Sequence, residues 1–239
     1  FAVCSADTGQ PLSSEAIPEP DALETELSSP AATAPVSDTG NTPAAPPVES
    51  KGQSDIIDSE QGNIYANGVP LLIVATAPGY GKLYVDSNRD AQLNDGEEEI
   101  TVLDPSYSYD SSNGFYLADT DIYGGYRDGN YTGNTFIALT GPYAGFQGIP
   151  ENSSPKGTVW NLYGGCASGN LTGSTQVIIA GGKVGNWLFG GNQNASVEGN
   201  TSITMTNGIV AGSVCGGSCG GTVTGNSAVT ISGGTVNNW

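Results

Sequence analysis

The stretch Leu162-Tyr163-Gly164-Gly165 decides how this chain folds, because it returns at a fixed spacing. It is followed 26 residues later by Leu188-Phe189-Gly190-Gly191 and, after the same interval, by Val214-Cys215-Gly216-Gly217. A period of this length indicates units that cannot bury an apolar face alone and must stack on their neighbours. The repeat therefore predicts a stacked structure, and it moves the question of function from pockets to surfaces.

Apolar residues fall into five columns when the chain is aligned in 26-residue steps, with a 14-residue insertion in the first unit. The third and fourth columns lie two residues apart, with hydroxyl residues such as Thr204 and Thr230 between them, which is the alternation of a strand with one buried face. Three short strands per unit, separated by glycine-rich corners, predict an all-β fold, a right-handed parallel β-helix (β-solenoid). The columns are Ile122, Leu162, Leu188, Val214; Tyr131, Leu171, Val197, Val223; Ile137, Val177, Ile203, Val229; Leu139, Ile179, Met205, Ile231; and Val184, Val210, Val236.

The composition divides the chain into three parts. Residues 1–52 are rich in Pro, Ser, Ala, Thr and Glu, and such a segment buries too little apolar surface to offset its ordering entropy. We expect it to be a disordered acidic linker. Residues 53–120 are expected to form a small β cap, and residues 121–239 hold the repeats, which stop within a unit and so predict a truncated C-terminus. The insertion, residues 141–157, is expected to loop out from a corner, either as a binding face or as a tolerated decoration.

The cap is expected because an uncovered first coil would expose a sheet edge and the core. Short apolar runs lie on both sides of Asn67-Gly68, a dipeptide typical of hairpin turns. Further strands are expected at residues 82–85 and 99–103, and nothing in this part has helical periodicity.

The charge of the chain is strongly acidic and uneven. Twenty-four acidic and six basic residues give a net charge of −18, all of it in residues 1–130. Six basic residues form no patch that would neutralise phosphates, which argues against nucleic acid as a partner. The absence of histidine removes the commonest general base. No apolar run approaches the length of about 18 residues that a membrane span needs.

The sharpest local motif is the acidic stretch of residues 86–97. Its spacing matches the twelve-residue calcium loop, in which oxygen ligands at alternate positions point to one centre. Ala91 stands where that loop uses glycine, so a positive φ there would cost roughly 1 kcal/mol, and Leu93 is expected to be the apolar anchor. We expect structural calcium that staples the cap, with a solvated acidic turn as the alternative. The candidate metal ligands are Asp86, Asn88, Asp90, Gln92 through its carbonyl, Asn94 and Glu97.

Other residues invite functional interpretations that the sequence does not favour. Asp119 and Asp121 could be compared with the acidic clusters of β-helical pectinases and lyases, but those sites need paired acids or a basic residue close by. Tyr163 and Phe189 share a column with Cys215, so they are expected to pack on one another rather than on sugars. Asparagines in glycosylation-like sequences are expected to form hydrogen-bonded ladders at the corners; they are Asn130, Asn152, Asn170, Asn194 and Asn200.

Residues 60–239 resemble the long repetitive surface proteins of Gram-positive gut anaerobes. The strings that carry the resemblance are Ile122-Tyr123-Gly124-Gly125, Leu162-Tyr163-Gly164-Gly165, residues 199–206, residues 229–234 and Leu83-Tyr84-Val85-Asp86. The resemblance implies secretion, a β-helical stalk and attachment to the cell wall through a C-terminal part that lies beyond this sequence.

The sequence thus favours a non-enzymatic, adhesin-like extracellular protein that presents an elongated β-helix to glycans or host-surface proteins. Two alternatives stay open. One is a subunit of an extracellular filament that assembles by stacking of coil ends. The other is a β-helical carbohydrate-active enzyme, a polysaccharide lyase or hydrolase.

Overall fold

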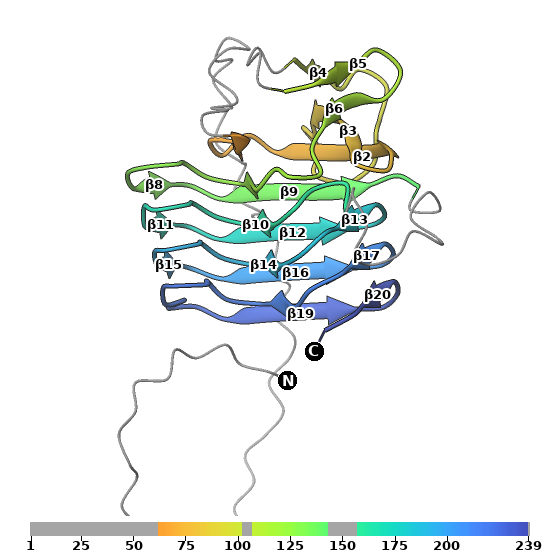
Figure 1. The fold of residues 1–239 in the computed structure, drawn as a ribbon. Helices are drawn as coiled ribbons and strands as arrows, with labels where there is room; N and C mark the ends of the chain where they lie inside the picture. Colours follow the sequence, from red (N-terminus) through yellow and green to blue (C-terminus); the bar gives the residue numbers. More distant parts are fainter. Residues whose placement is uncertain (1–61, 102–106, 143–156, 239) are drawn as a thin grey trace, which may run out of the picture. The chain divides into compact units, whose positions relative to one another are not determined.

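The computed structural model describes residues 62–101, 107–142 and 157–238, which form an all-β structure with extensive parallel sheets (Figure 1). Within these ranges, successive repeats add strands to the same sheets, so segments that are far apart in sequence pair side by side. The predicted linker, residues 1–52, and most of the insertion, residues 143–156, lie outside the described residues.

The strands of the described residues form four sheets. The first contains five parallel strands: β1 (Ile64–Tyr65), β7 (Ile122–Tyr123), β10 (Leu162–Tyr163), β14 (Leu188–Phe189) and β18 (Val214–Cys215). The second contains β8 (Tyr131–Thr132), β11 (Leu171–Thr172) and β15 (Val197–Glu198). The third contains β13 (Lys183–Val184), β17 (Ile209–Val210) and β20 (Thr235–Val236). The largest sheet has a parallel part and an antiparallel part. Its parallel strands are, in order, β19 (Ser227–Ile231), β16 (Thr201–Met205), β12 (Thr175–Ile179), β9 (Thr135–Thr140) and β2 (Leu71–Ala77). The antiparallel part continues from β2 through β3 (Tyr80–Val85), β6 (Gly114–Tyr116) and β5 (Tyr109–Asp110), and β4 (Glu99–Ile100) also pairs with β3.

The strand register confirms the five apolar columns. Leu162 pairs with Ile122 on one side and with Leu188 on the other, and Val177 pairs in the same way with Ile137 and Ile203. Many side-chain hydrogen bonds between repeats join residues 26 positions apart, or 40 where the insertion intervenes. Most column side chains are fully buried, so each repeat covers the apolar face of the one before it. In the last described repeat, the exposed fraction of Val229 and Ile231 rises to 36%.

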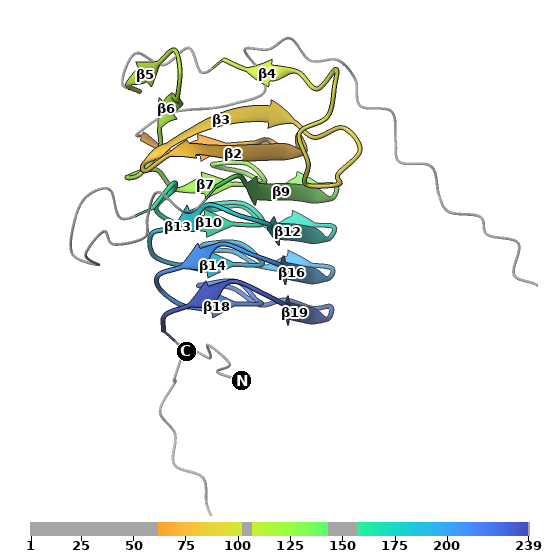
Figure 2. The same cartoon turned by 90° about the vertical axis from the view of Figure 1, so that its right-hand side faces the viewer.

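The strands on either side of Asn67-Gly68 do not pair with each other. The turn has positive φ angles of 54° and 83°, but β1 pairs in parallel with β7, and β2 pairs in parallel with β9. The two predicted strands around the turn are therefore confirmed. Each pairs with the next repeat rather than with the other, because Ile64 and Leu71 bury their apolar side chains in the core shared with that repeat. Antiparallel pairing begins with β3, which lies along β2 on the side away from β9 (Figure 2).

Asn192 satisfies buried backbone groups at a corner of the stack. Its side chain is fully buried; Oδ1 accepts a hydrogen bond from the Cys166 amide at 2.7 Å, and Nδ2 donates to the carbonyl oxygens of Gly169 and Ser196 at 3.0 and 2.8 Å. This asparagine is a structural residue that links two repeats.

Replacing Asn192 with alanine is expected to lower the free energy of unfolding by about 2 kcal/mol, because buried polar groups lose their partners. Urea denaturation measures the change. The control is Asn194→Ala, two residues away, which removes an exposed side chain. Equal losses in the two variants would contradict a specific role for the Asn192 amide.

Candidate functional site

The acidic loop lies between β3 and β4 and covers part of the largest sheet. Ala91, at its centre, packs in a buried cluster with Leu72, Phe136 and Ala138, and Figure 2 shows the loop reaching beside β9. Phe136 and Ala138 alternate along β9 with Ile137, which belongs to the core between the sheets. The loop therefore shields apolar side chains on the outer face of the sheet. The paired positions in the later repeats are more polar, with Ser202 and Thr204 on β16 as the clearest case.

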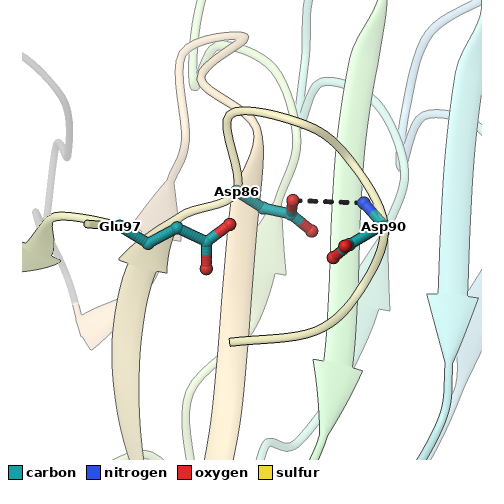
Figure 3. A group of neighbouring side chains, drawn as sticks. All are labelled: Asp86, Asp90 and Glu97. Atoms are coloured by element: carbon teal, nitrogen blue, oxygen red, sulfur yellow. Dashed lines mark hydrogen bonds between the residues drawn. The ribbon is translucent and has the colours of Figure 1, made fainter. Parts of the chain in front are cut away.

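Three acidic side chains of the loop converge. Carboxylate oxygens of Asp86, Asp90 and Glu97 all lie within 4.8 Å of one another (Figure 3). Asp86 is fully buried; its Oδ2 accepts a hydrogen bond from the Ala91 amide at 3.0 Å, and its Oδ1 accepts one from the Asp90 amide at 3.2 Å. Burial raises the pKa of the Asp86 carboxyl, although these two amides act in the opposite direction. A cation beside Asp86 would compensate the charge that burial disfavours.

The backbone of the loop has the predicted strain. Ala91 has a φ of 62°, and Arg89 has a φ of 58°, so the chain turns sharply at the position where the calcium loop uses glycine. The predicted role of Leu93 as the apolar anchor is wrong, because its side chain is 49% exposed. Since the loop is flanked by strands rather than by two helices, the buried apolar position is Ala91.

The remaining predicted ligands lie around the same carboxylates. The Asn94 Nδ2 atom donates to both carboxylate oxygens of Asp90, at 3.1 and 3.0 Å, and to the Gln92 carbonyl at 3.1 Å. The Asn88 Nδ2 atom also donates to Asp90, at 3.0 Å. An amide rotated by half a turn fills the same volume and presents its oxygen instead. Four of the six predicted ligands are therefore joined by hydrogen bonds of side chains or of the Gln92 carbonyl. They are Asn88, Asp90, Gln92 and Asn94.

Glu97 has one carboxylate oxygen that is not used by the protein. Its Oε2 accepts a hydrogen bond from the Asn94 amide at 3.1 Å. Its Oε1 is buried and has no hydrogen-bond partner among the described residues. A buried oxygen of this kind is costly unless something binds it, and it belongs to the residue that the calcium loop uses as its last ligand.

The two acids considered for catalysis lie in different surroundings. Asp119 is exposed. Asp121 is half-buried, and its Oδ1 accepts hydrogen bonds from the Asn161 side-chain and backbone nitrogens at 2.8 and 3.2 Å. Burial raises the pKa of Asp121, against the lowering effect of these bonds. Asp121 is therefore part of a polar contact between neighbouring repeats.

A pH-dependent stability is expected from Asp121. Because its pKa is raised in the folded state, the folded protein binds this proton more tightly than the unfolded chain does. The resulting stabilisation is fully present below the ordinary pKa of aspartate and is lost as the pH rises through the raised pKa. Asp121→Asn should therefore gain stability relative to the natural chain as the pH rises above about 4, the ordinary pKa of aspartate, measured by urea unfolding. An equal change in Asp119→Asn would contradict this assignment.

The aromatic column packs on itself as predicted. Tyr65, Tyr123, Tyr163 and Phe189 form a continuous stack, with ring centroids 4.9, 4.7 and 5.2 Å apart and interplanar angles of 13°, 4° and 2°. Burial, followed in effect by the charge of Asp121, raises the pKa of Tyr163 to about 12. These rings stabilise the stack and are not available to an external ligand.

The predicted asparagine ladders are confirmed for three of the five residues, whereas Asn152 lies outside the described residues and the Asn194 amide donates to its neighbour Gln193 at 3.4 Å. The Oδ1 atom of Asn130 accepts a hydrogen bond from the Asn170 amide at 3.1 Å, and the Oδ1 atom of Asn170 accepts one from the Ser196 amide at 3.0 Å. The Oδ1 atom of Asn200 accepts one from the Asn226 amide at 2.8 Å. Corner asparagines thus bind the backbone of the adjacent repeat, which favours a structural role for them over glycosylation.

No family model, curated protein or solved structure matches this chain. Its function must therefore be argued from the residues and their geometry. Across residues 62–101, 107–142 and 157–238, no helix is long and apolar enough to cross a membrane.

Proposed function

We propose that this chain is a secreted, adhesin-like surface protein whose repeats form a right-handed parallel β-helix that acts as a scaffold rather than as an enzyme. The observation that supports this proposal most is the scarcity of charged residues in the repeats. Residues 157–238 contain one acid, Glu198, and one base, Lys183, and Lys183 is buried. A stack with so few titratable groups suits the display of a polar surface better than acid–base chemistry. The resemblance to repetitive surface proteins of Gram-positive gut anaerobes supports the same proposal.

The proposal includes a calcium ion in the loop of residues 86–97. Hard cations take six to eight oxygen ligands, and the convergent carboxylates of Asp86, Asp90 and Glu97 favour such an ion. The Gln92 carbonyl and the amides of Asn88 and Asn94 complete the set. The ion would hold the loop against Phe136 and Leu72, so its role is to fix the cap on the first parallel strands.

The expected partners are glycans or proteins of a host surface. The purified full chain should bind at least one class of immobilised oligosaccharide or a host-cell surface, measured on a glycan array and by binding to fixed epithelial cells. Absence of binding in both measurements would contradict the adhesin proposal. The calcium proposal is tested separately by thermal unfolding.

Polysaccharide cleavage is a second candidate, which the raised pKa of Asp121 favours. Its test is the release of reducing or unsaturated ends from a panel of polysaccharides. Cleavage by the natural chain that is lost in Asp121→Asn would replace the scaffold proposal with an enzymatic one.

A further inference from the structure

The chain contains three asparagines that are followed directly by glycine: Asn67, Asn113 and Asn207. An asparagine in this position can lose its side-chain amide without an enzyme, because the nitrogen of the next residue lies within reach of the side-chain carbonyl carbon. Glycine favours the reaction, since it places no side chain beside the attacking nitrogen and adopts many backbone conformations. Asparagine is among the thermolabile residues of proteins, and the surroundings of each pair decide where the reaction takes place.

Two of the three pairs are held by hydrogen bonds. Within Asn67-Gly68, the glycine amide donates to the Gly124 carbonyl at 2.9 Å, so the attacking nitrogen is engaged. Within Asn113-Gly114, the asparagine Nδ2 atom donates to the Asp110 Oδ1 atom at 2.9 Å, and the glycine pairs with the same aspartate between β5 and β6. Each of these turns must open before its asparagine can react.

The pair Asn207-Gly208 has neither restraint. It lies in the turn between β16 and β17 (Figure 1), and the asparagine is exposed, so water reaches its side chain. Within the residues that the structure describes, neither the side chain of Asn207 nor the amide of Gly208 makes a hydrogen bond. The attacking nitrogen and the carbonyl carbon that it attacks are therefore both unengaged in the folded state.

The fold itself requires glycine after Asn207. Gly208 has a φ of 89°, which only glycine adopts readily. A Cβ atom at this position would also lie 2.6 Å from the carbonyl oxygen of Gly181 in the preceding repeat. The residue that makes Asn207 reactive therefore cannot be exchanged without strain in the turn.

We propose that Asn207 deamidates spontaneously in the folded protein. The Gly208 nitrogen forms a bond to the Asn207 Cγ atom and the Cγ–Nδ2 bond breaks, so that Nδ2 leaves as ammonia with the proton of the Gly208 amide. Water then opens the cyclic imide at one of its two carbonyl carbons, which gives aspartate or isoaspartate. In total, an amide and water become a carboxylic acid and ammonia, with no oxidation or reduction.

The reaction changes both the charge and the backbone of the stack. Residues 157–238 contain one acid and one base, so a carboxylate at position 207 gives this part a net negative charge. Isoaspartate also adds one methylene group to the main chain just before β17, where the Val210 side chain is fully buried. Because β17 pairs in register with β13 and β20, the isoaspartate product should unfold at a lower urea concentration than the natural chain.

The test is peptide mapping by mass spectrometry on the full chain, incubated folded and, in a parallel sample, unfolded in guanidinium chloride. In the unfolded sample the three pairs should react at similar rates. In the folded sample Asn207 should keep most of that rate, whereas Asn67 and Asn113 should react at least about tenfold more slowly, since each must first leave a hydrogen-bonded turn. The matched control is Asn207→Gln, which keeps an exposed amide but needs a larger ring, so the folded variant should release almost no ammonia.

The outcomes decide the proposal directly. Aspartate and isoaspartate that form in the folded chain at position 207, with Asn67 and Asn113 intact, support it. Protection of Asn207 as strong as that of the other two asparagines overturns it, and so does faster reaction at either of them. The rate at Asn207 should also rise from neutral to mildly alkaline pH, because the attacking nitrogen must lose its proton. A rate that does not change with pH would contradict the cyclic imide.

Discussion

Calcium is expected to raise the midpoint of thermal unfolding of this chain, and excess chelator is expected to reverse the rise. A ligand that binds only the folded state adds about 2.7 kcal/mol to the free energy of unfolding at a hundredfold excess over its Kd. The physical reason is the buried Asp86 carboxylate, together with the unpartnered Oε1 atom of Glu97. Scanning calorimetry with calcium and with chelator measures the difference.

Two neighbouring glutamates provide a matched test of this calcium effect. Glu97→Gln keeps the size of the side chain but removes the charge of the last ligand, so the calcium-dependent increase should disappear. Glu98→Gln removes the same charge from an exposed residue and should keep the increase. If the midpoint of the natural chain is the same with calcium and with chelator, the loop is an acidic turn without a metal.

Replacing Gly164 with alanine is expected to lower the free energy of unfolding by about 3 kcal/mol. A Cβ atom at this position would overlap the carbonyl oxygen of Gly190 in the next repeat. That backbone cannot move away easily, because the Gly164 amide donates to the Phe189 carbonyl at 2.9 Å and the Gly190 amide donates to the Cys215 carbonyl at 2.8 Å. Urea denaturation followed by circular dichroism measures the loss.

The control for this variant is Gly217→Ala. A Cβ atom on Gly217 meets only ordinary van der Waals contact, with the nearest atom, Cγ2 of Val223, at 3.7 Å. This variant should therefore keep nearly the stability of the natural chain. A similar loss in both variants would show that general loss of glycine flexibility, rather than close approach of two repeats, explains the effect.

The columns were predictable from sequence because each consists of apolar residues, such as Leu162 and Leu188, that recur at a constant interval. The two strands around Asn67-Gly68 were also predictable, but the strands with which they pair were not. The dipeptide determines only the conformation of the turn. The strands on either side pair where their side chains are buried in the shared core, and for Leu71 the partner is Ile137, which lies far along the chain.

The candidate metal ligands were predictable because their spacing is local. Their surroundings were not, since the contact of Ala91 with Phe136 joins segments that no local pattern connects. The exposure of Leu93 has the same origin, because the strands that flank the loop orient it differently from a pair of helices. The contact of Tyr109 with Phe115 was not predictable either, because these residues meet only after β5 turns back onto β6.

The constant register of the repeats has a consequence for the length of the molecule. Leu188 and Val214 occupy equivalent positions in neighbouring repeats, so deleting residues 188–213 would join Trp187 to Val214 at matching points of two repeats. Such a change removes one layer and leaves the contacts between the others in place, shortening the stack by about 4.8 Å. The number of layers is therefore adjustable in whole steps, provided that the newly joined layers replace contacts such as those of Asn192.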